Sequence, residues 1–478
     1  MNKSMIRYLL SKLLLIEAVL LLVPVAIAVY YRESSQVFTA LFSTIGILVL
    51  LGGSGSLQKP KNQRIYAKEG VLIVALCWIL WSFFGGLPFV FSGQIPSLID
   101  AFFEISSGFT TTGASILNDV SVLSRSLLFW RSFTHLIGGM GVLVFALAIM
   151  DNAKNSHLEV MKAEVPGPVF GKVVSKLKNT AQILYLLYLA LFSLFVIIYY
   201  LAGMPLYDSF VIAMGTAGTG GFTVYNDGIA HYGSSLITYL VSIGVLVFGV
   251  NFNLYYLMLR RIKAFFGDEE LRAYLVIVLV STGLISLNTL YLYPGFSKSF
   301  EMTFFQVSNI ITTTGFGYGD ITNWPLFSQF ILLFLMAIGG SAGSTAGGLK
   351  IIRGLILSKI AKNQILSILS PHRVLTLHVN KTVIDKDTQH KILKYFVIYA
   401  MILLALIFIV SLDSNDFLVV TSAVFSCFNN IGPILGTTSS FSIFSPISKI
   451  LLSFAMIAGR LEIYPILLLF MKRTWSKR

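Results

Sequence analysis

The segment TTTGFGYGD, residues 312–320, decides how the rest of the sequence is expected to fold. A run of threonines leads into glycines at every second position. This pattern is typical of a backbone strand whose carbonyl oxygens replace the hydration shell of a cation. Such a strand needs four copies around one axis. Either four chains assemble, or this chain carries the other copies itself.

The composition indicates a membrane protein. Hydrophobic residues make up 56% of the 478 residues and only 12% are charged, and the mean hydropathy is +0.81. Apolar runs of about 18 residues or more recur from end to end. The first, residues 8–30, is longer than a signal-peptide core and lacks a convincing cleavage site, so we expect a retained helix. Cys77 and Cys427 both lie in apolar surroundings, which argues against a disulfide framework or a cysteine metal site.

The apolar runs and the charges together predict the topology. Candidate spans lie near residues 8–30, 37–54, 69–92, 124–150, 180–203, 233–259, 272–294, 325–360, 392–412 and 446–471. Lysine and arginine, which give a formal net charge of +14, crowd alternate connections at residues 59–68, 154–178, 260–272 and 359–394. These connections and both termini are therefore expected on the cytoplasmic side. The basic patches could also hold anionic lipid or a cytosolic partner, although topology alone accounts for them.

Imperfect copies of the opening segment occur in the outward connections. The copies are TTTGAS (residues 110–115), GTGGFT (218–223), TTTGFG (312–317) and NNIGPI (429–434). Each follows an apolar stretch of about a dozen residues, a length that re-enters a membrane rather than spanning it. Their key glycines recur about every hundred residues, as expected for an internal repeat. The sequence therefore predicts that one chain supplies all four strands.

A dehydrated monovalent cation needs oxygen ligands, which backbone carbonyls supply without a fixed charge that would trap it. Glycine allows the backbone conformations that turn these carbonyls to the axis. The expected ion is potassium, and the predicted filter residues are Thr111, Thr112, Gly113, Gly220, Gly221, Thr313, Thr314, Gly315, Asn430, Ile431 and Gly432. Because the fourth copy has asparagines and a proline, we expect only moderate exclusion of sodium.

Acidic residues flank the predicted filter on both sides. Asp100, Asp208, Glu301 and Asp416 stand near the expected starts of the short helices, where they could cap free amides. Asp119, Asp227 and Asp320 follow the key glycines. We expect them at the outer mouth, where they would attract cations, although solvated loop acids explain each one equally well.

With these motifs in view, the chain resembles the membrane-spanning subunit of the Trk and Ktr potassium transporter family, specifically the TrkH type. The resemblance covers nearly the whole chain. It rests on the four filter segments and on WRSFTHLIGGMGVLVFALAIM (130–150), AEVPGPV (163–169), GGSAGSTAGGLKIIR (339–353) and GRLEIYPILLLF (459–470). The two helices expected before Lys59 favour the longer TrkH branch over the shorter KtrB branch.

The resemblance implies more than composition could. It implies a homodimer with one pore in each protomer, in a bacterial cytoplasmic membrane. It also implies a cytosolic regulatory ring of the TrkA kind that senses nucleotide. No covalent cofactor is expected, nucleotide would act only through the partner, and no nucleic acid is involved.

A second feature concerns gating. The run 326–360 is too long for one span and is interrupted by GGSAGSTAGG (339–348). Tight helix packing would explain small residues, but so many glycines disfavour a continuous helix, and unwound backbone is tolerated beside a watery cavity. We expect a loop below the filter; the predicted gate residues are Gly339, Gly340, Gly343, Ser344, Thr345, Gly347, Gly348, Lys350 and Arg460.

Four ionisable residues in apolar segments have expected roles. Arg460 needs carbonyls or a counter-charge to be stable in its apolar helix, and the resemblance implies that it contacts the loop. Glu462 could pair with it, although positions two apart on a helix point to different faces. Arg131 and His135, on the helix after the first filter, are interpreted as structural.

The expected fold is an all-α membrane protein. Two N-terminal helices (1–58) precede four pseudo-repeats of helix, re-entrant pore helix with filter loop, and helix, at 59–155, 156–265, 266–365 and 366–478. An enzyme is disfavoured, because the six histidines are scattered and form no catalytic constellation. A proton- or sodium-coupled potassium symporter remains the alternative to a gated channel, since broken helices occur there too.

Overall fold

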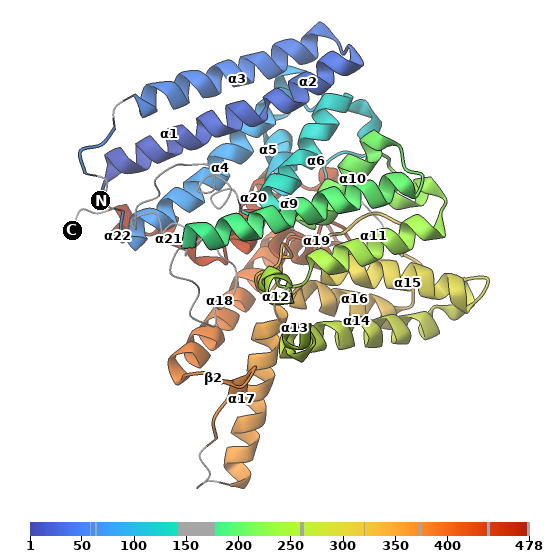
Figure 1. The fold of residues 1–478 in the computed structure, drawn as a ribbon. Coiled ribbons are helices and arrows are strands. Elements are labelled where there is room, and N and C mark those ends of the chain that lie inside the picture. The colour runs from blue at the N-terminus through green and yellow to red at the C-terminus, as the bar shows by residue number, and fades with distance from the viewer. Residues whose placement is uncertain are drawn as a thin grey trace.

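Helices account for almost all of the regular structure in the computed structural model, which describes residues 1–57, 59–62, 65–141, 177–258, 262–319, 321–370, 372, 375–436 and 440–475. The long helices run side by side through the body (Figure 1). Among the described residues, strands occur only in a hairpin of β1 (His378–Val379) and β2 (Thr382–Val383), which follows the helix that projects from the body.

The N-terminal part is a helical hairpin packed on the first repeat. It consists of α1 (Lys3–Leu20), α2 (Leu22–Tyr31) and α3 (Ser35–Ser56). Glycines let α1 and α3 approach closely, because a Cβ on Gly52 or Gly55 would overlap atoms of Ser11 or Leu15. The hairpin lies at one edge of the molecule beside α4 (Figure 1).

The rest of the chain repeats one pattern: a long helix, a short helix, an irregular loop and a further helix. The repeats comprise α4 (Ala67–Phe91), α5 (Leu98–Phe109) and α6 (Arg125–Gly139); α9 (Leu177–Leu201), α10 (Leu206–Gly218) and α11 (Ser235–Phe248); α14 (Glu269–Asn288), α15 (Phe296–Ile311) and α16 (Leu326–Ile338); and α18 (Lys386–Val410), α19 (Phe417–Phe428) and α20 (Pro446–Arg460). This order confirms the predicted fold of two N-terminal helices followed by four pseudo-repeats.

Further helices and turns lie between the repeats, within them or after the last one. They are the helices α12 (Phe252–Met258), α13 (Ile262–Gly267), α17 (Ile351–Leu369), α21 (Tyr464–Phe470) and α22 (Lys472–Trp475), and the 3-10 turns η1 (Val120–Val122), η3 (Gly228–Tyr232), η4 (Leu290–Leu292) and η5 (Phe441–Ile443). Helix α17 points away from the body (Figure 1).

Two of the ten candidate spans, 233–259 and 446–471, are interrupted in addition to 325–360, whose interruption the glycine-rich run predicted. Within the described ranges, six helices are long and apolar enough to cross a membrane, and a seventh span results if α11 and α12, which meet at 90°, are counted together. The predicted spans 124–150, 325–360 and 446–471 contain shorter helices instead. The first of these spans extends into residues outside the described ranges, as do the basic connection 154–178 and the motif at 163–169.

The helices that follow the irregular loops are interrupted at comparable places. Helix α11 ends before Gly249, α16 ends at Gly339 (φ 73°), and α20 gives way to Glu462 and Ile463 at φ 57° and 69°. Sequence reasoning found only the interruption after α16, because that one is marked by a dense run of glycines. At the ends of α11 and α20 the sequence offers only isolated glycines, such as Gly249 and Gly459, which do not by themselves predict a break.

Glycine also brings these helices against the ends of the short helices. A Cβ on Gly138 of α6 would overlap the carbonyl oxygen of Phe109, the last residue of α5. In the same way, a Cβ on Gly459 of α20 would overlap the carbonyl oxygen of Phe428, the last residue of α19. The two repeats therefore use the same backbone contact to support the start of the irregular loop.

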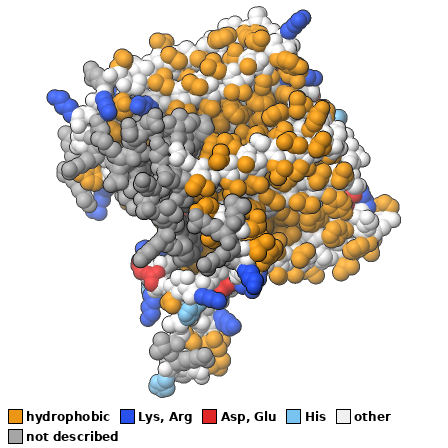
Figure 2. All heavy atoms as spheres, in the orientation of Figure 1, with side chains coloured by type: hydrophobic (Ala, Val, Ile, Leu, Met, Phe, Trp, Pro, Cys, Tyr) orange, Lys and Arg blue, Asp and Glu red, His pale blue; other side chains and the backbone are white. Residues whose placement is uncertain are grey.

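The surface agrees with a multi-pass membrane protein. Figure 2 shows hydrophobic side chains over a broad face of the helical body, with Lys and Arg mostly at its margins. Large apolar side chains such as Leu279, Leu186 and Phe334 are 65–70% exposed. Apolar exposure of this extent suits a surface in contact with lipid.

We expect Gly459→Val to destabilise the protein, because the added side chain meets a backbone carbonyl that cannot rotate away. Overpacking of this kind costs about 1–3 kcal/mol, and a lower midpoint of thermal unfolding in detergent would reveal it. The control is Gly354→Ala in α17, where no atom lies within 4 Å of the added carbon. Equal midpoints for both variants would contradict the close approach.

Candidate ion pathway

The four irregular loops share one backbone conformation. The key glycines Gly113, Gly221, Gly315 and Gly432 have φ values of 79°, 78°, 72° and 107°. The residues two positions earlier, Thr111, Thr219, Thr313 and Asn430, have φ values of 56°, 54°, 56° and 58°. Positive φ is uncommon for residues other than glycine, so its recurrence at equivalent positions marks a repeated structure. Sequence reasoning missed Thr219, because only the alignment of backbone angles identifies it as the counterpart of the other three.

The loops also lie around one axis. A Cβ on Gly113 would overlap the carbonyl oxygen of Gly220, and one on Gly221 would overlap that of Thr314. The remaining contacts close the circle: Gly315 faces the carbonyl oxygen of Ile431, and Gly432 faces that of Thr112. Each glycine thus lies against the carbonyl of the residue that precedes the next glycine. We call these loops filter strands 1 to 4.

Threonine and asparagine side chains link the inner ends of the strands. The hydroxyls of Thr110 and Thr112 lie 2.8 Å apart, as do those of Thr312 and Thr314. In strand 4, Asn430 instead donates from Nδ2 to Thr112 Oγ1 at 2.9 Å and so joins strand 4 to strand 1. Sequence comparison treated this asparagine as a departure from the pattern; at the position that Thr111 and Thr313 occupy in strands 1 and 3, its amide adds a bond between strands.

Each of three filter strands is held by a different side chain of its own short helix. Glu104 accepts from Ser115 Oγ and Ile116 N, both at 2.9 Å, in strand 1. Gln306 donates to the carbonyl oxygen of Tyr318 at 2.8 Å in strand 3. Ser422 accepts from Leu435 N at 2.9 Å in strand 4. The four strands therefore share one backbone arrangement, but the side chains that hold strands 1, 3 and 4 differ.

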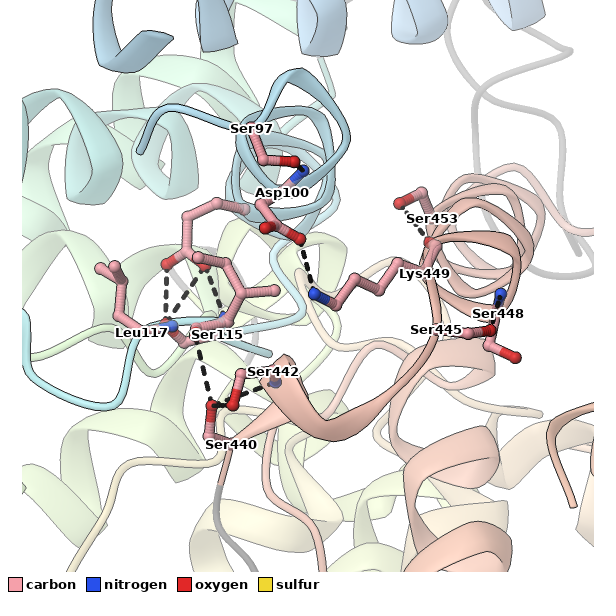
Figure 3. Close-up of polar contacts among 12 residues, drawn as sticks. Ser97, Asp100, Ser115, Leu117, Ser440, Ser442, Ser445, Ser448, Lys449 and Ser453 are labelled. Atoms are coloured by element: carbon pink, nitrogen blue, oxygen red, sulfur yellow. Dashed lines mark hydrogen bonds and ion pairs between the residues drawn. The ribbon is translucent and has the colours of Figure 1, made fainter. Parts of the chain in front are cut away.

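Beyond the glycines, further bonds connect neighbouring strands into a closed outer belt. Between strands 1 and 2, Asn226 accepts from Val120 N at 2.8 Å and donates to Asp119 at 2.7 Å. The other links run from Ile229 N to Gly317 O (2.9 Å), from Thr322 Oγ1 to Gly436 O (3.1 Å) and from Phe441 N to Ser115 O (3.0 Å). Figure 3 shows the last junction, where Ser440 and Ser442 lie beside Ser115.

The predicted outer acids take part in this belt to different degrees. Asp119 is exposed, and hydrogen bonds from Asn226 and Ser121 lower the pKa of its carboxyl, so it stays ionised at neutral pH. Asp227 lies 3.3 Å from the ring nitrogen of His231. Asp320 falls outside the described residues.

The prediction that four acids cap the short helices is right only for Asp416, which accepts from Leu418 N at 2.9 Å and Val419 N at 3.2 Å. The carboxylates of the other three acids bind side chains instead of the free backbone amides. Asp100 binds Lys449 at 2.7 Å, while Ser97 caps α5 (Figure 3). Asp208 accepts from Tyr232 at 3.0 Å, and Glu301, inside α15, pairs with Lys298 at 2.8 Å.

The glycine-rich segment 339–350 lies at the inner end of the filter strands. It connects α16 to α17 without helical structure. Its Gly347 N donates to Thr313 Oγ1 at 2.6 Å, and a Cβ on Gly347 would overlap the carbonyl oxygen of Asn429. The segment therefore touches both strand 3 and the start of strand 4. We call it the inner loop.

Arg460 fastens the inner loop to another repeat. Its Nη1 donates to Thr345 O at 2.6 Å, and its Nη2 donates to Gly138 O and Gly139 O, both at 2.6 Å. The predicted gate residue Lys350 donates to Ala346 O within the loop. Glu462, considered as a partner of Arg460, forms an ion pair with Arg353.

Glu270 is a buried residue that sequence reasoning missed. It accepts from Ala342 N at 2.8 Å and from Ile352 N at 3.1 Å, and so holds both the inner loop and the first turn of α17. The signal available in the sequence is an acid at the start of a long apolar helix. Its partners lie more than seventy positions away, and only the fold brings them together.

The apolar helices and the four equivalent loops around one axis define a multi-pass membrane protein. Residues 34–477 match the family model TrkH, whose description is "Cation transport protein", so the chain belongs to the TrkH family of cation transport proteins. This membership confirms the expected family and agrees with a transport function rather than an enzymatic one.

Several relatives match over nearly their full lengths. The chain is 32% identical over 464 residues to the "Trk system potassium uptake protein TrkG" of Escherichia coli K12, which covers 95% of each chain. It is 30% identical over 483 residues to a TrkH of Vibrio parahaemolyticus, with 99% of each covered. The crystal structure of the potassium transporter TrkH from Vibrio parahaemolyticus superposes with a TM-score of 0.90 at 29% identity and covers all of both chains.

We expect Asn226→Ala to loosen the outer belt between strands 1 and 2, because it removes both links across that junction. At about 0.5–1.5 kcal/mol for each bond, hydrogen exchange of residues 115–122 should rise roughly tenfold. Ser121→Ala is the matched control, since Ser121 binds Asp119 within one loop. Equal exchange in the two variants would rule out the link as a restraint.

Proposed function

We propose that this chain is the membrane subunit of a potassium uptake system, and that potassium crosses through the four filter strands. The single observation that carries the proposal is the closed circle in which each key glycine faces the carbonyl of the next strand. The relatives named as potassium uptake proteins support the choice of ion.

Selection would depend on the carbonyl oxygens of Thr112, Gly220, Thr314 and Ile431. Four carbonyls replace part of the hydration shell of potassium without a fixed charge. The short helices aim their carbonyl ends at the same region, and the partial negative charge there favours a cation. The oxygens Thr111 Oγ1 and Asn430 Oδ1 have no hydrogen-bond partner among the described residues, so either could contact an ion or water at the inner end. A single ring of this kind supports moderate discrimination against sodium.

The inner loop would act as the gate. Its contacts with Thr313 and Asn429 would obstruct the inner end of the pathway. Arg460 would hold the closed arrangement, because it donates to Thr345 of the loop and to the end of α6. Opening would then require the hydrogen bonds of Arg460 to break. Those of Glu270 would remain and hold the loop and the first turn of α17 together during the movement.

A homodimer with a cytosolic, nucleotide-binding partner of the TrkA kind completes the proposal. The basic connections would face the cytoplasm by their charge, and α17 with its following hairpin would project on that side (Figure 1). Nucleotide bound to the partner would then act on α17, which is continuous with the inner loop. The protein would lie in the bacterial cytoplasmic membrane with both termini inside.

For the filter, we expect Gly315→Ser to weaken discrimination between potassium and sodium, because the new side chain would displace the carbonyl of Ile431. The measurement is rubidium uptake into proteoliposomes with increasing sodium, present at equal concentration on both sides so that neither a sodium nor a proton gradient exists. Gly283→Ser in α14, where no atom lies within 4 Å, is the matched control. Parental discrimination in a folded Gly315→Ser protein would refute the filter assignment.

For the gate, shortening the inner loop should raise uptake strongly in the absence of any partner protein. Arg460→Ala should raise it about ten- to hundredfold, if its charge-assisted hydrogen bonds form only in the closed state. Lys391→Ala, which removes an exposed ion pair on α18, should leave uptake unchanged. If the shortened loop transports like the parent, the glycine-rich segment serves helix packing and the gate lies elsewhere.

A further inference from the structure

Arg131, on α6, is buried behind filter strands 1 and 2. Its Nε lies 2.5 Å from Glu104 Oε1 on α5, and the side chains of Arg131 and Glu104 are 3% and 0% exposed. Nη1 of this guanidinium has no hydrogen-bond partner among the described residues. The guanidinium carbon instead lies 3.3 Å from the centre of the Phe222 ring. Arg131 therefore has two main partners, a carboxylate and an aromatic face.

The carboxylate partner connects Arg131 to filter strand 1. Glu104 accepts from Ser115 and Ile116, the second and third residues after Gly113. A carboxylate that accepts from both a backbone amide and a guanidinium is fixed in position as well as neutralised. Strand 1 is therefore fastened to the Arg131–Glu104 pair directly beyond its key glycine.

The aromatic partner connects Arg131 to filter strand 2. Phe222 directly follows Gly221, and its ring also packs on His135, with ring centres 4.2 Å apart. A Cβ on Gly220 would overlap the same His135 ring. Strand 2 is thus pressed against α6, a helix of the neighbouring repeat, by residues on both sides of Gly221.

We propose that the Arg131–Glu104 pair is a specificity-determining brace that sets the distance between filter strands 1 and 2. The inference rests on the proposed filter function. Arg131 and Glu104 act through the strands, so they are positioning residues. The carbonyls that the brace would space are those of Thr112 and Gly220, which follow one another around the ring.

The physical case depends on the type of contact. A desolvated guanidinium is attracted far more strongly to the face of an aromatic ring than to an aliphatic side chain. The contact therefore holds the Phe222 ring in position. Because the carboxylate neutralises the guanidinium, the brace adds no net charge behind the ring of carbonyls. Loss of the brace would let strand 2 move outward. The carbonyl of Gly220 would then lie farther from a dehydrated potassium ion, and discrimination would fall.

The test is rubidium uptake by the full-length protein in proteoliposomes, with sodium as the competing ion. We expect Phe222→Leu and Arg131→Gln each to change the ratio of rubidium to sodium transport about tenfold, the upper range for a buried contact of this kind. Phe222→Tyr keeps the aromatic face and should retain the parental ratio. Combined in one chain, Phe222→Leu and Arg131→Gln should have little more effect than Arg131→Gln alone, because that variant already removes the contact between Arg131 and Phe222.

The control is Asp100→Asn, which removes a different ion pair of the same short helix, that with Lys449 (Figure 3). It should keep the parental ratio. Arg131→Lys, which keeps the charge but not the planar group, replaces Arg131→Gln if that variant does not fold, and should lower the ratio as well. A parental ratio in folded Phe222→Leu protein, with Gly315→Ser still disturbed, would overturn the brace alone. A parent protein without preference for rubidium over sodium would overturn the proposed filter and the brace with it.

Discussion

The structure depends on a backbone constraint: a carbonyl oxygen of each filter strand occupies the place where the key glycine of the preceding strand would carry a Cβ. Only glycine leaves that place empty. The constraint fixes one residue type at four positions and demands that four short helices end close together. Gly138 and Gly459 meet the second demand, since they let the following helix touch the last carbonyl of α5 and α19.

Apart from these glycines, the repeats have diverged. The backbone angles of Thr111, Thr219, Thr313 and Asn430 agree within a few degrees, from 54° to 58°. The side chains that support the strands include a carboxylate, a primary amide and a hydroxyl on the short helices. The ring requires particular backbone angles, and many hydrogen-bonding groups can hold a strand at those angles. Divergence is therefore possible everywhere except at the positions that another strand approaches.

The sequence predicted the elements whose signal is local. Repeated glycines revealed the four filter strands, and the dense glycine run at 339–348 predicted the break between α16 and α17. Features that arise from partners distant in the sequence were missed or misinterpreted. Asp100 looked like a helix cap, but Lys449, 349 positions away, binds it. The roles of Glu104 and Glu270 were invisible for the same reason, as they depend on which helices meet.

The unequal supports of the filter strands have a consequence for how such a pathway can change. In an assembly of four identical subunits, a substitution is present in all four subunits at once. Even a mild change of one residue therefore alters the pathway at four places. Here the four quarters are covalently joined, and a change at Glu104, Gln306 or Ser422 alters one quarter alone. Under the proposed function, ion preference can accordingly change in small increments, one strand at a time, while the other three strands keep the ring intact.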